Sequence, residues 1–181
     1  MKTVSNITTY QKISMDPLCA KDEQILIEDV AHALSLLCRA NGHFPHFYSV
    51  AQHSLNCMKE AEARGYSKAV QLGCLLHDAS EAYLSDITRP IKPHLIGYFE
   101  IEKRLQNQIF QKWISPSLTE EELEQITQID DAILYYEFVH LMAQKLFDEE
   151  PTLLSTPTVD FVEFTTIEQA FLQAFYLLKN E

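Results

Sequence analysis

Residues 67–84 read SKAVQLGCLLHDASEAYL, and this stretch indicates both the fold class and the place of a functional site. Its apolar residues recur at helical spacing behind Ser67, a favourable N-cap, so we expect one helix from Ser67 to about Leu84. The middle of this helix is apolar around most of its circumference, which predicts a position in the core. His77 and Asp78 stand inside it, where an unpaired buried carboxylate is costly. The doublet therefore needs a binding partner.

The preceding part of the chain has the same helical period. Apolar residues fall on one stripe over about 25–38, and Asp29 is the expected N-cap of that helix. Ser49 is expected to cap a second helix over about 50–63, which Gly65 ends. The link to the next helix is short, so the two helices should lie side by side and antiparallel.

The remainder of the chain predicts more helices and one long irregular stretch. Two prolines make residues 86–93 a loop. We expect further helices at about 94–114, at 120–146 behind a capping box, and from Thr166 onward, with residues 150–165 irregular. These patterns predict an all-α fold: a single domain over residues 1–181, built as a compact bundle of about six main helices.

Composition narrows the classes of function. With only 4 glycines, the chain is a poor match for a turn-rich β fold or a glycine-rich phosphate loop. The net charge of −12 opposes binding to nucleic acid or to an anionic membrane, so we expect neither as a partner. The chain has no apolar run long enough for a membrane span and no apolar leader, which favours a cytoplasmic protein. The four cysteines form no CxxC motif and are interpreted as small buried apolar residues.

The His77-Asp78 doublet suggests a metal site. Imidazole nitrogens and carboxylate oxygens are good ligands for divalent ions, and Glu81 follows one turn later on the expected helix. One helical turn cannot complete a coordination sphere. His53 on the preceding helix is the first additional candidate, and either Asp130 or Asp131 on the 120–146 helix is the second.

The order of these residues resembles a known family. The series His53, His77-Asp78, Asp130 is similar to the signature of HD-domain metal-dependent phosphohydrolases. The flanking sequence is also similar to that of the bacterial 5′-deoxynucleotidases and of a bacterial and phage branch of HD nucleotide phosphohydrolases. The resemblance covers about residues 15–137 and is carried by residues 27–35, Cys38-Arg39, Gly42-His43, 47–54, 77–81, Asp86 and Pro90-Ile91-Lys92.

The resemblance implies roles for individual residues. Metal ligands would be His53, His77, Asp78 and Asp130, the last preferred to Asp131 because Leu134 and Glu137 follow it at the family's spacing. Glu81 and Asp86 would handle the attacking water, and Arg39 would contact the phosphate. Lys92 is either a second phosphate contact or a solvated loop lysine, and His43 and His46 are either substrate contacts or surface residues. Ala40 stands where the deoxynucleotidases have a tryptophan.

The expected function is therefore a metal-dependent phosphohydrolase. One divalent ion would be the cofactor, and Mn, Co, Fe, Ni, Zn and Mg all remain open. The expected substrates are small (deoxy)nucleotides, foremost 5′-deoxynucleoside monophosphates. A deoxynucleoside triphosphate triphosphohydrolase and a non-catalytic nucleotide-binding module are the alternatives. The resemblance and the apolar last helix, with Phe171 and Phe175, also predict a homodimer or larger homo-oligomer.

Overall fold

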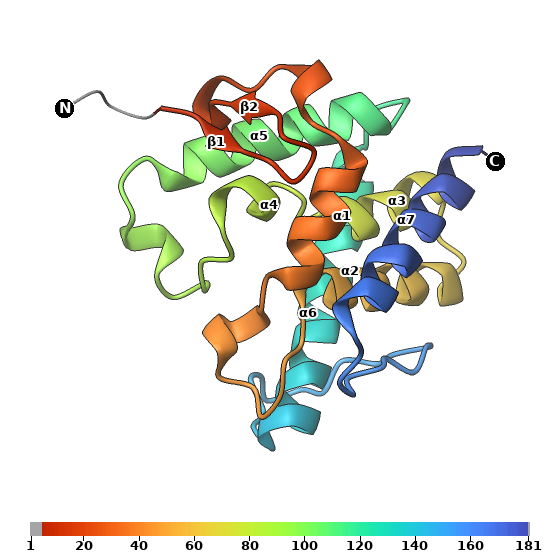
Figure 1. Ribbon diagram of the computed structural model, residues 1–181. Helices are drawn as coiled ribbons and strands as arrows, with labels where there is room; N and C mark the ends of the chain where they lie inside the picture. The colour runs from red at the N-terminus through yellow and green to blue at the C-terminus, as the bar shows by residue number, and fades with distance from the viewer. Residues whose placement is uncertain (1–4, 181) are drawn as a thin grey trace.

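The computed structural model describes residues 5–180 and has an all-helical fold, as predicted (Figure 1). Within these residues there are six helices of nine residues or more: α1 (Ile27–Leu36), α2 (Val50–Ala63), α3 (Lys68–Leu76), α5 (Tyr98–Trp113), α6 (Glu120–Met142) and α7 (Phe164–Asn180). A one-turn helix α4 (Glu81–Leu84) lies between α3 and α5. No helix in this part of the chain combines the length and apolarity that a membrane crossing needs.

Residues 5–26, before α1, form a small cap with little regular structure. Strands β1 (Ile7–Thr8) and β2 (Ser14–Met15) pair antiparallel, and two short 3-10 turns follow at Pro17–Cys19 and Asp22–Gln24. Asp29 anchors this cap, because its carboxylate accepts the Gln11 backbone N–H at 2.7 Å. Asp29 was therefore wrongly predicted as an N-cap: α1 begins at Ile27, and Asp29 lies in its first turn.

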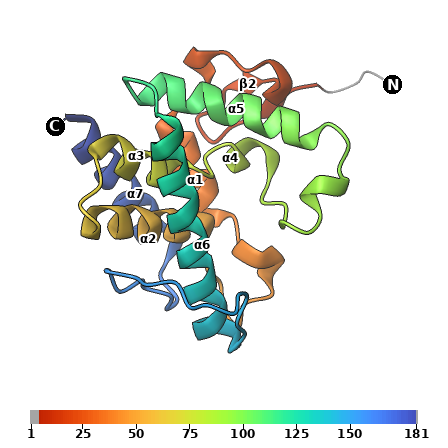
Figure 2. The same ribbon diagram turned by 180° about the vertical axis from the view of Figure 1, so that it is seen from behind.

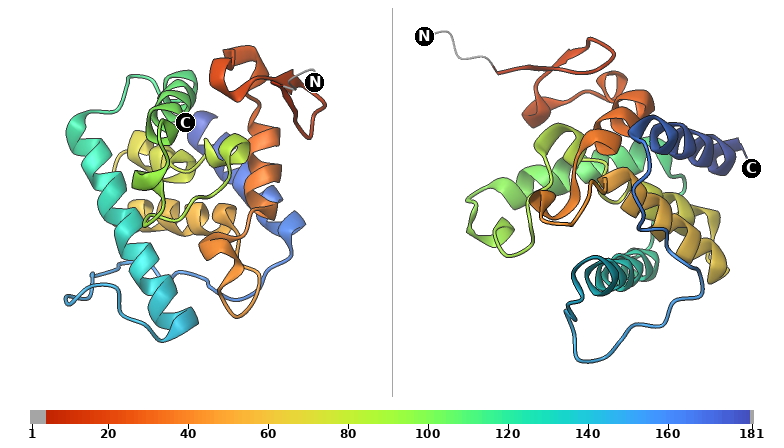
Figure 3. Two further views of the ribbon diagram at one scale, coloured as in Figure 1. Left: turned by 90° about the vertical axis from the view of Figure 1, so that its left-hand side faces the viewer. Right: turned by 60° about the horizontal axis from the view of Figure 1, so that its bottom comes forward.

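Helices α2 and α3 lie side by side, α6 crosses both, and α7 covers α1 on the opposite side (Figures 2 and 3). The contact between α3 and α6 is close at Gly73, because a side chain there would overlap the Ile126 side chain. His77 follows Gly73 by one turn, and Asp130 follows Ile126 by one turn. The close approach of these two helices therefore brings His77 and Asp130 together.

The predicted helix from Ser67 to Leu84 is wrong at its centre, because α3 ends at Leu76 and residues 77–80 form a turn. The physical cause is Gln106 on α5. Its side-chain amide donates to the Leu76 carbonyl at 2.7 Å and accepts the Ser80 N–H at 3.0 Å. These are the two groups that would bond to each other in a continuous helix. An inserted side chain thus opens the helix at the His77-Asp78 doublet.

Other helix ends also differ from the prediction. The first helix ends at Leu36 rather than Cys38, and the fifth ends at Met142 because Ala143 adopts a left-handed backbone (φ 52°). Gly97, with φ 78°, starts α5 at Tyr98, four residues later than predicted. The N-caps Ser49 and Ser67 and the Thr119–Glu122 capping box are confirmed. The last helix begins at Phe164, before the predicted start.

Residues 143–163 form an irregular segment that passes over α2 and α6 (Figure 3). Three buried polar residues of α2 hold it, at positions four apart: Gln52, Asn56 and Glu60. Gln52 donates to two carbonyls and Asn56 bonds both backbone groups of Thr158. Glu60 accepts the N–H groups of Leu154 and Ser155 and the Ser155 hydroxyl. We call Gln52, Asn56 and Glu60 the strap anchors.

The aromatic residues of α7 are mostly internal. Phe171 and Phe175 are buried, and Phe175 packs edge-on against Trp113 at 5.4 Å. Tyr176 and Leu177 remain exposed. The prediction of a homo-oligomer therefore rests on fewer exposed residues than the sequence suggested. Of the cysteines, Cys57 and Cys74 are buried as predicted, Cys38 is partly exposed, and Cys19 is exposed, contrary to prediction.

Candidate metal centre and adjoining cavity

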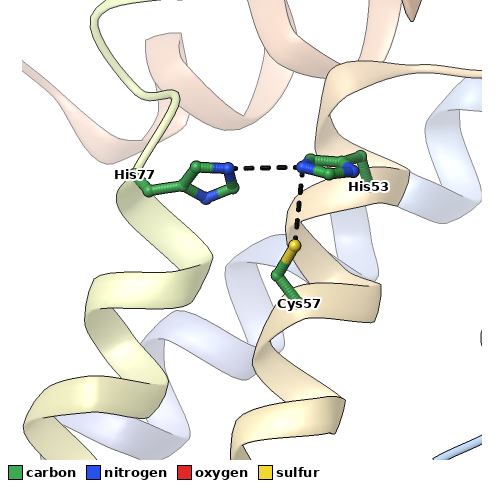
Figure 4. Close-up of side chains that lie close together, drawn as sticks. All are labelled: His53, Cys57 and His77. Carbon is green, nitrogen blue, oxygen red and sulfur yellow. Dashed lines mark hydrogen bonds between the residues drawn. The ribbon is translucent and has the colours of Figure 1, made fainter. Parts of the chain in front are cut away.

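Two imidazoles face each other where α2, the end of α3 and α6 meet. The Nε2 atoms of His53 and His77 lie 3.3 Å apart (Figure 4). The other nitrogen of each ring is fixed: His53 Nδ1 lies 2.6 Å from Glu137 Oε1, and His77 Nδ1 lies 2.8 Å from the Cys74 carbonyl. Because a carbonyl only accepts, His77 carries its proton on Nδ1, and an ionised Glu137 imposes the same tautomer on His53. In the neutral form of both rings, two Nε2 lone pairs then point at each other across the gap.

Two carboxylates complete the group. Asp130 Oδ1 lies 3.0 Å from His53 Nε2 and 3.7 Å from His77 Nε2, while Asp78 Oδ2 lies 3.3 Å from His77 Nε2 and 4.0 Å from His53 Nε2. Ligands about 2.1 Å from a common ion lie roughly 3.0–3.5 Å apart. The donor atoms and most of their spacings therefore fit one divalent ion. The structure brings together the four predicted ligands His53, His77, Asp78 and Asp130.

The geometry favours Asp130 over Asp131 as the candidate metal ligand. Asp131 is 40% exposed and pairs with Arg89, whereas Asp130 points one oxygen at the imidazoles and the other at Arg89 Nη2, 2.6 Å away. Burial opposes ionisation of Asp130, but the influence of the neighbouring His53 and His77 rings outweighs it and holds the pKa of Asp130 well below its usual range. Asp130 is thus placed as an ionised donor, and Arg89, which the sequence analysis did not single out, orients it.

A softer donor lies on the buried side of the same group. Cys57 Sγ is 3.4 Å from His53 Nε2, and Cys57, His53 and His77 offer donor atoms within 4.8 Å of one another (Figure 4). Burial raises the pKa of the Cys57 thiol to about 11, so in this environment the sulfur retains its proton. The structure therefore contains two overlapping donor sets that share both imidazoles.

Glu137 is the main residue of the site that sequence analysis did not assign. It is fully buried on α6, bonds His53 Nδ1, and accepts the Tyr48 hydroxyl at 2.8 Å. Hydrogen bonds of this kind fix the tautomer and orientation of a metal-binding histidine. Its position seven residues after Asp130, on the same side of the helix, was the available signal.

The two carboxylates predicted to handle water lie beside the candidate metal centre, outside the group of four donor residues. Glu81 is buried, its Oε1 lies 3.3 Å from Lys92 Nζ, and its Oε2 has no hydrogen-bond partner among the described residues. Burial, together with Asp78 and Asp86, raises the pKa of Glu81 well above its usual range. Burial, together with Asp78, also raises the pKa of Asp86. A carboxyl group with a raised pKa can both accept and donate a proton near neutral pH.

The predicted phosphate contacts are held by ion pairs. Arg39 donates from Nη1 to Asp78 Oδ2 at 3.2 Å, and its Nη2 lies 3.5 Å from Glu137. Lys92 Nζ bridges Glu81 and Glu102, the latter at 2.7 Å. Lys92 is therefore a paired residue of the site and not a solvated loop lysine. Arg39 opens a 3-10 turn, Arg39–Gly42, just after α1.

These groups border a cavity of about 580 Å³. Its charged lining consists of Arg39, Arg89 and Lys92 with Asp78, Glu81, Asp86 and Asp130. His43 also lines it, whereas His46 bonds the Val159 carbonyl at 2.8 Å and takes part in holding residues 143–163. The remaining wall is mainly apolar and includes Phe44, Leu134, Phe138, Met142, Leu146 and Phe147.

Comparison with known proteins finds two bacterial relatives, both described as uncharacterised. No family model matches the chain. It is 38% identical over 107 residues to the uncharacterised protein YfdR of Escherichia coli (strain K12), an alignment that covers 59% of this chain and 53% of that protein. It is 33% identical over 125 residues to the uncharacterised protein RCAP_rcc00048 of Rhodobacter capsulatus, covering 66% of this chain and 63% of that protein. The chain thus spans less than two thirds of the length of each relative.

Proposed function

We propose that the protein is a metal-dependent phosphohydrolase of the HD-domain type, acting on small nucleotides, foremost 5′-deoxynucleoside monophosphates. The observation that carries the proposal is the convergence of four donor atoms, two imidazole Nε2 and two carboxylate oxygens, at one end of a cavity. Converging lone pairs and carboxylates repel one another unless a cation lies among them.

The charges of the cavity support a phosphate as the ligand. Its lining has three cationic side chains against four carboxylates, so without a bound cation the cavity is net negative and opposes an anion. One divalent ion reverses that sign locally. A dianionic phosphate would then have a favourable site within a protein whose net charge is −12.

The chain's own residues would divide the work of hydrolysis. A bound divalent ion supplies Lewis acidity toward the phosphate and increases the acidity of water. Arg39, already oriented by Asp78 and Glu137, would donate to phosphate oxygens. Glu81 or Asp86 would take a proton from the water whose oxygen attacks phosphorus. The bond from phosphorus to the nucleoside 5′-oxygen breaks, and that oxygen takes up a proton as it leaves.

The competing proposals predict other outcomes of one experiment. Purified protein is incubated with deoxynucleoside mono- and triphosphates in the presence of each candidate divalent ion, and phosphate or triphosphate release is measured. Release of phosphate from monophosphates supports the proposal, and release of triphosphate supports the triphosphohydrolase alternative. Ion-dependent nucleotide binding without turnover would support a non-catalytic binding module.

A further inference from the structure

Helix α5 presents three polar side chains to the chain segment that carries most of the candidate site. Tyr98, Glu102 and Gln106 follow one another at intervals of four residues, so they lie on one face of the helix and span about 12 Å. All three are half-buried, and each bonds the segment 76–92, which includes α4 (Figure 2). We call Tyr98, Glu102 and Gln106 the α5 stripe.

Gln106 lies at the end of the α5 stripe beside the His77-Asp78 doublet. Its amide bonds the Leu76 carbonyl and the Ser80 N–H, the backbone groups on either side of the doublet. Ser80 is buried, so solvent is a poor substitute for the bond to its N–H. Because both candidate ligands stand in the turn that Gln106 holds open, the directions of their side chains depend on these two bonds.

Glu102, one turn earlier, restrains the carboxylate of Glu81. Its Oε1 holds Lys92 Nζ at 2.7 Å, and the same ammonium group lies 3.3 Å from Glu81 Oε1. Glu81 is buried, and its Oε2 has no hydrogen-bond partner among the described residues. The position of this carboxylate therefore depends on Lys92, and through Lys92 on Glu102.

Tyr98, at the start of α5, holds the backbone that leads to Asp86. Its hydroxyl donates to the Ser85 carbonyl at 3.1 Å, and the Ser85 N–H donates to the Glu81 carbonyl at 2.8 Å. Ser85 has φ 75° and ψ 154°, a conformation that residues other than glycine rarely adopt and that persists only where the surroundings impose it. The bond from Tyr98 therefore helps to fix the direction of the chain at Asp86.

We propose that the α5 stripe positions the groups that would bind the metal and handle water. Gln106 fixes the turn that carries two of the ligands, and the other two members fix the carboxylates of Glu81 and Asp86. All three are positioning residues, since each acts through a neighbouring group. The inference rests on the proposed phosphohydrolase function. A purely structural stripe would change stability alone, whereas positioning predicts a separate effect on metal affinity or on kcat for each member.

The first test compares two glutamines of α5 that each make two hydrogen bonds. Gln106→Met and Gln108→Met remove these bonds at similar side-chain size, and Gln108 bonds the Ala20 carbonyl and Asp22, away from the site. Affinity for Mn²⁺ alone is measured by titration calorimetry, and stability by thermal unfolding. We expect both variants to unfold at a lower temperature, but only Gln106→Met to bind Mn²⁺ more weakly, by about 10–100-fold.

Steady-state kinetics on the best nucleotide substrate test the other two members. Glu102→Gln weakens the hold on Lys92 and should lower kcat by about 10-fold, with KM and the Mn²⁺ dissociation constant within about two-fold. Tyr98→Phe retains the ring without the donor and should lower kcat by about 3-fold. Glu100→Gln, at an exposed position of the same helix, is the control and should leave kcat unchanged.

The results separate this inference from the proposed function. Equal Mn²⁺ affinity in Gln106→Met and Gln108→Met, or unchanged kcat in Glu102→Gln, would reject the positioning role while an active enzyme keeps the function. If Gln106→Met does not fold, Glu102→Gln and Tyr98→Phe decide the question. If no nucleotide is turned over, the proposed function fails, and Mn²⁺ affinity still tests Gln106. A protein that binds neither Mn²⁺ nor another candidate ion would overturn both.

Discussion

Helix α2 contributes to two sets of polar side chains, the strap anchors and the four candidate metal ligands. The two sets differ in how their hydrogen bonds are satisfied. On one side the strap anchors bond backbone groups of residues 154–160, and Glu60 alone accepts bonds from Leu154, Ser155 and Arg64. On the other side His53 points Nε2 at another imidazole nitrogen and at carboxylates. The first set has complementary partners within the fold. The second has donor atoms that converge on one point.

This difference separates a structural role from a binding role. Buried polar groups that are fully paired stabilise a particular chain path, whereas buried groups that face like groups mark a site for a ligand. Tyr48 links the two sets, since it donates to Glu137 and accepts from Asn56. Substitutions in the two sets should therefore change different measurements: activity and metal content for one set, and stability for the other.

The largest effect is expected for Asp78→Ala. Loss of one ligand of the proposed ion should reduce the metal content to near zero and lower kcat/KM by more than about 10³-fold. Elemental analysis and steady-state kinetics measure both. Asp131→Ala is the matched control, because Asp131 is next to Asp130 in sequence but pairs with Arg89 near the surface. Full metal occupancy in Asp78→Ala would remove Asp78 from the ligand set.

Glu81→Gln should lower kcat by about 10²–10⁴-fold, the usual range for a general acid or base. The amide retains the size of the side chain but cannot exchange a proton. Metal content should stay near that of the unaltered protein, because Glu81 lies outside the group of four donors. A variant that loses its metal would show that Glu81 is itself a ligand.

Arg39→Lys should mainly raise KM, by an amount corresponding to about 2–4 kcal/mol in binding. A lysine retains the charge but cannot contact Asp78, Glu137 and a phosphate in one plane. The structure adds the expectation of a weaker hold on the metal in Arg39→Ala, since Asp78 and Glu137 both lose a partner. Unchanged KM and kcat in Arg39→Ala would leave phosphate binding to other residues, with Lys92 the next to test.

Substitution of a strap anchor should lower stability and leave the metal content unchanged. Glu60→Gln leaves backbone donors of Leu154 and Ser155 poorly paired and should lower the free energy of unfolding by about 2–3 kcal/mol, with metal content retained. Glu62→Gln, on an exposed position of the same helix, is the control. Denaturant unfolding measures the change, and an equal loss of metal would contradict separate roles for the two sets.

The loss of stability in Glu60→Gln should depend on pH. Burial raises the pKa of Glu60, but hydrogen bonds from Ser155, Arg64 and Leu154 outweigh it, so the pKa in the folded protein lies below the usual 4.5. The carboxylate therefore stabilises the fold above about pH 4.5, and this contribution is lost as the pH falls below that value. The stability gap between Glu60→Gln and the unaltered protein should narrow in acid.

The candidate metal ligands and the strap anchors also differ in how well the sequence predicted them. The four candidate ligands could be identified in the sequence because histidines and aspartates interrupt apolar helical patterns, a local signal. The break in the helix after Leu76 could not be predicted, because it is caused by Gln106, which lies thirty residues later in the sequence. Nothing in the sequence around Gln106 marks it as a residue that opens another helix. The strap anchors were missed for a similar reason: an irregular segment gives no periodicity, so its partners on α2 cannot be identified before folding.

The smallest effect is expected for Cys57→Ser, which distinguishes the two overlapping donor sets. If the ion is held by the two histidines with Asp78 and Asp130, the variant should retain its metal and its kcat/KM within about two-fold. A carboxylate can bind a metal without first losing a proton at neutral pH, whereas a thiol must lose its proton, which favours this outcome. Cobalt substitution provides a direct readout, since a thiolate ligand gives an intense charge-transfer band in the near ultraviolet. We expect no such band in the unaltered protein. A strong band that disappears in Cys57→Ser, together with loss of metal, would assign the ion to the buried set with sulfur, and the two aspartates would then be free to interact with substrate or water.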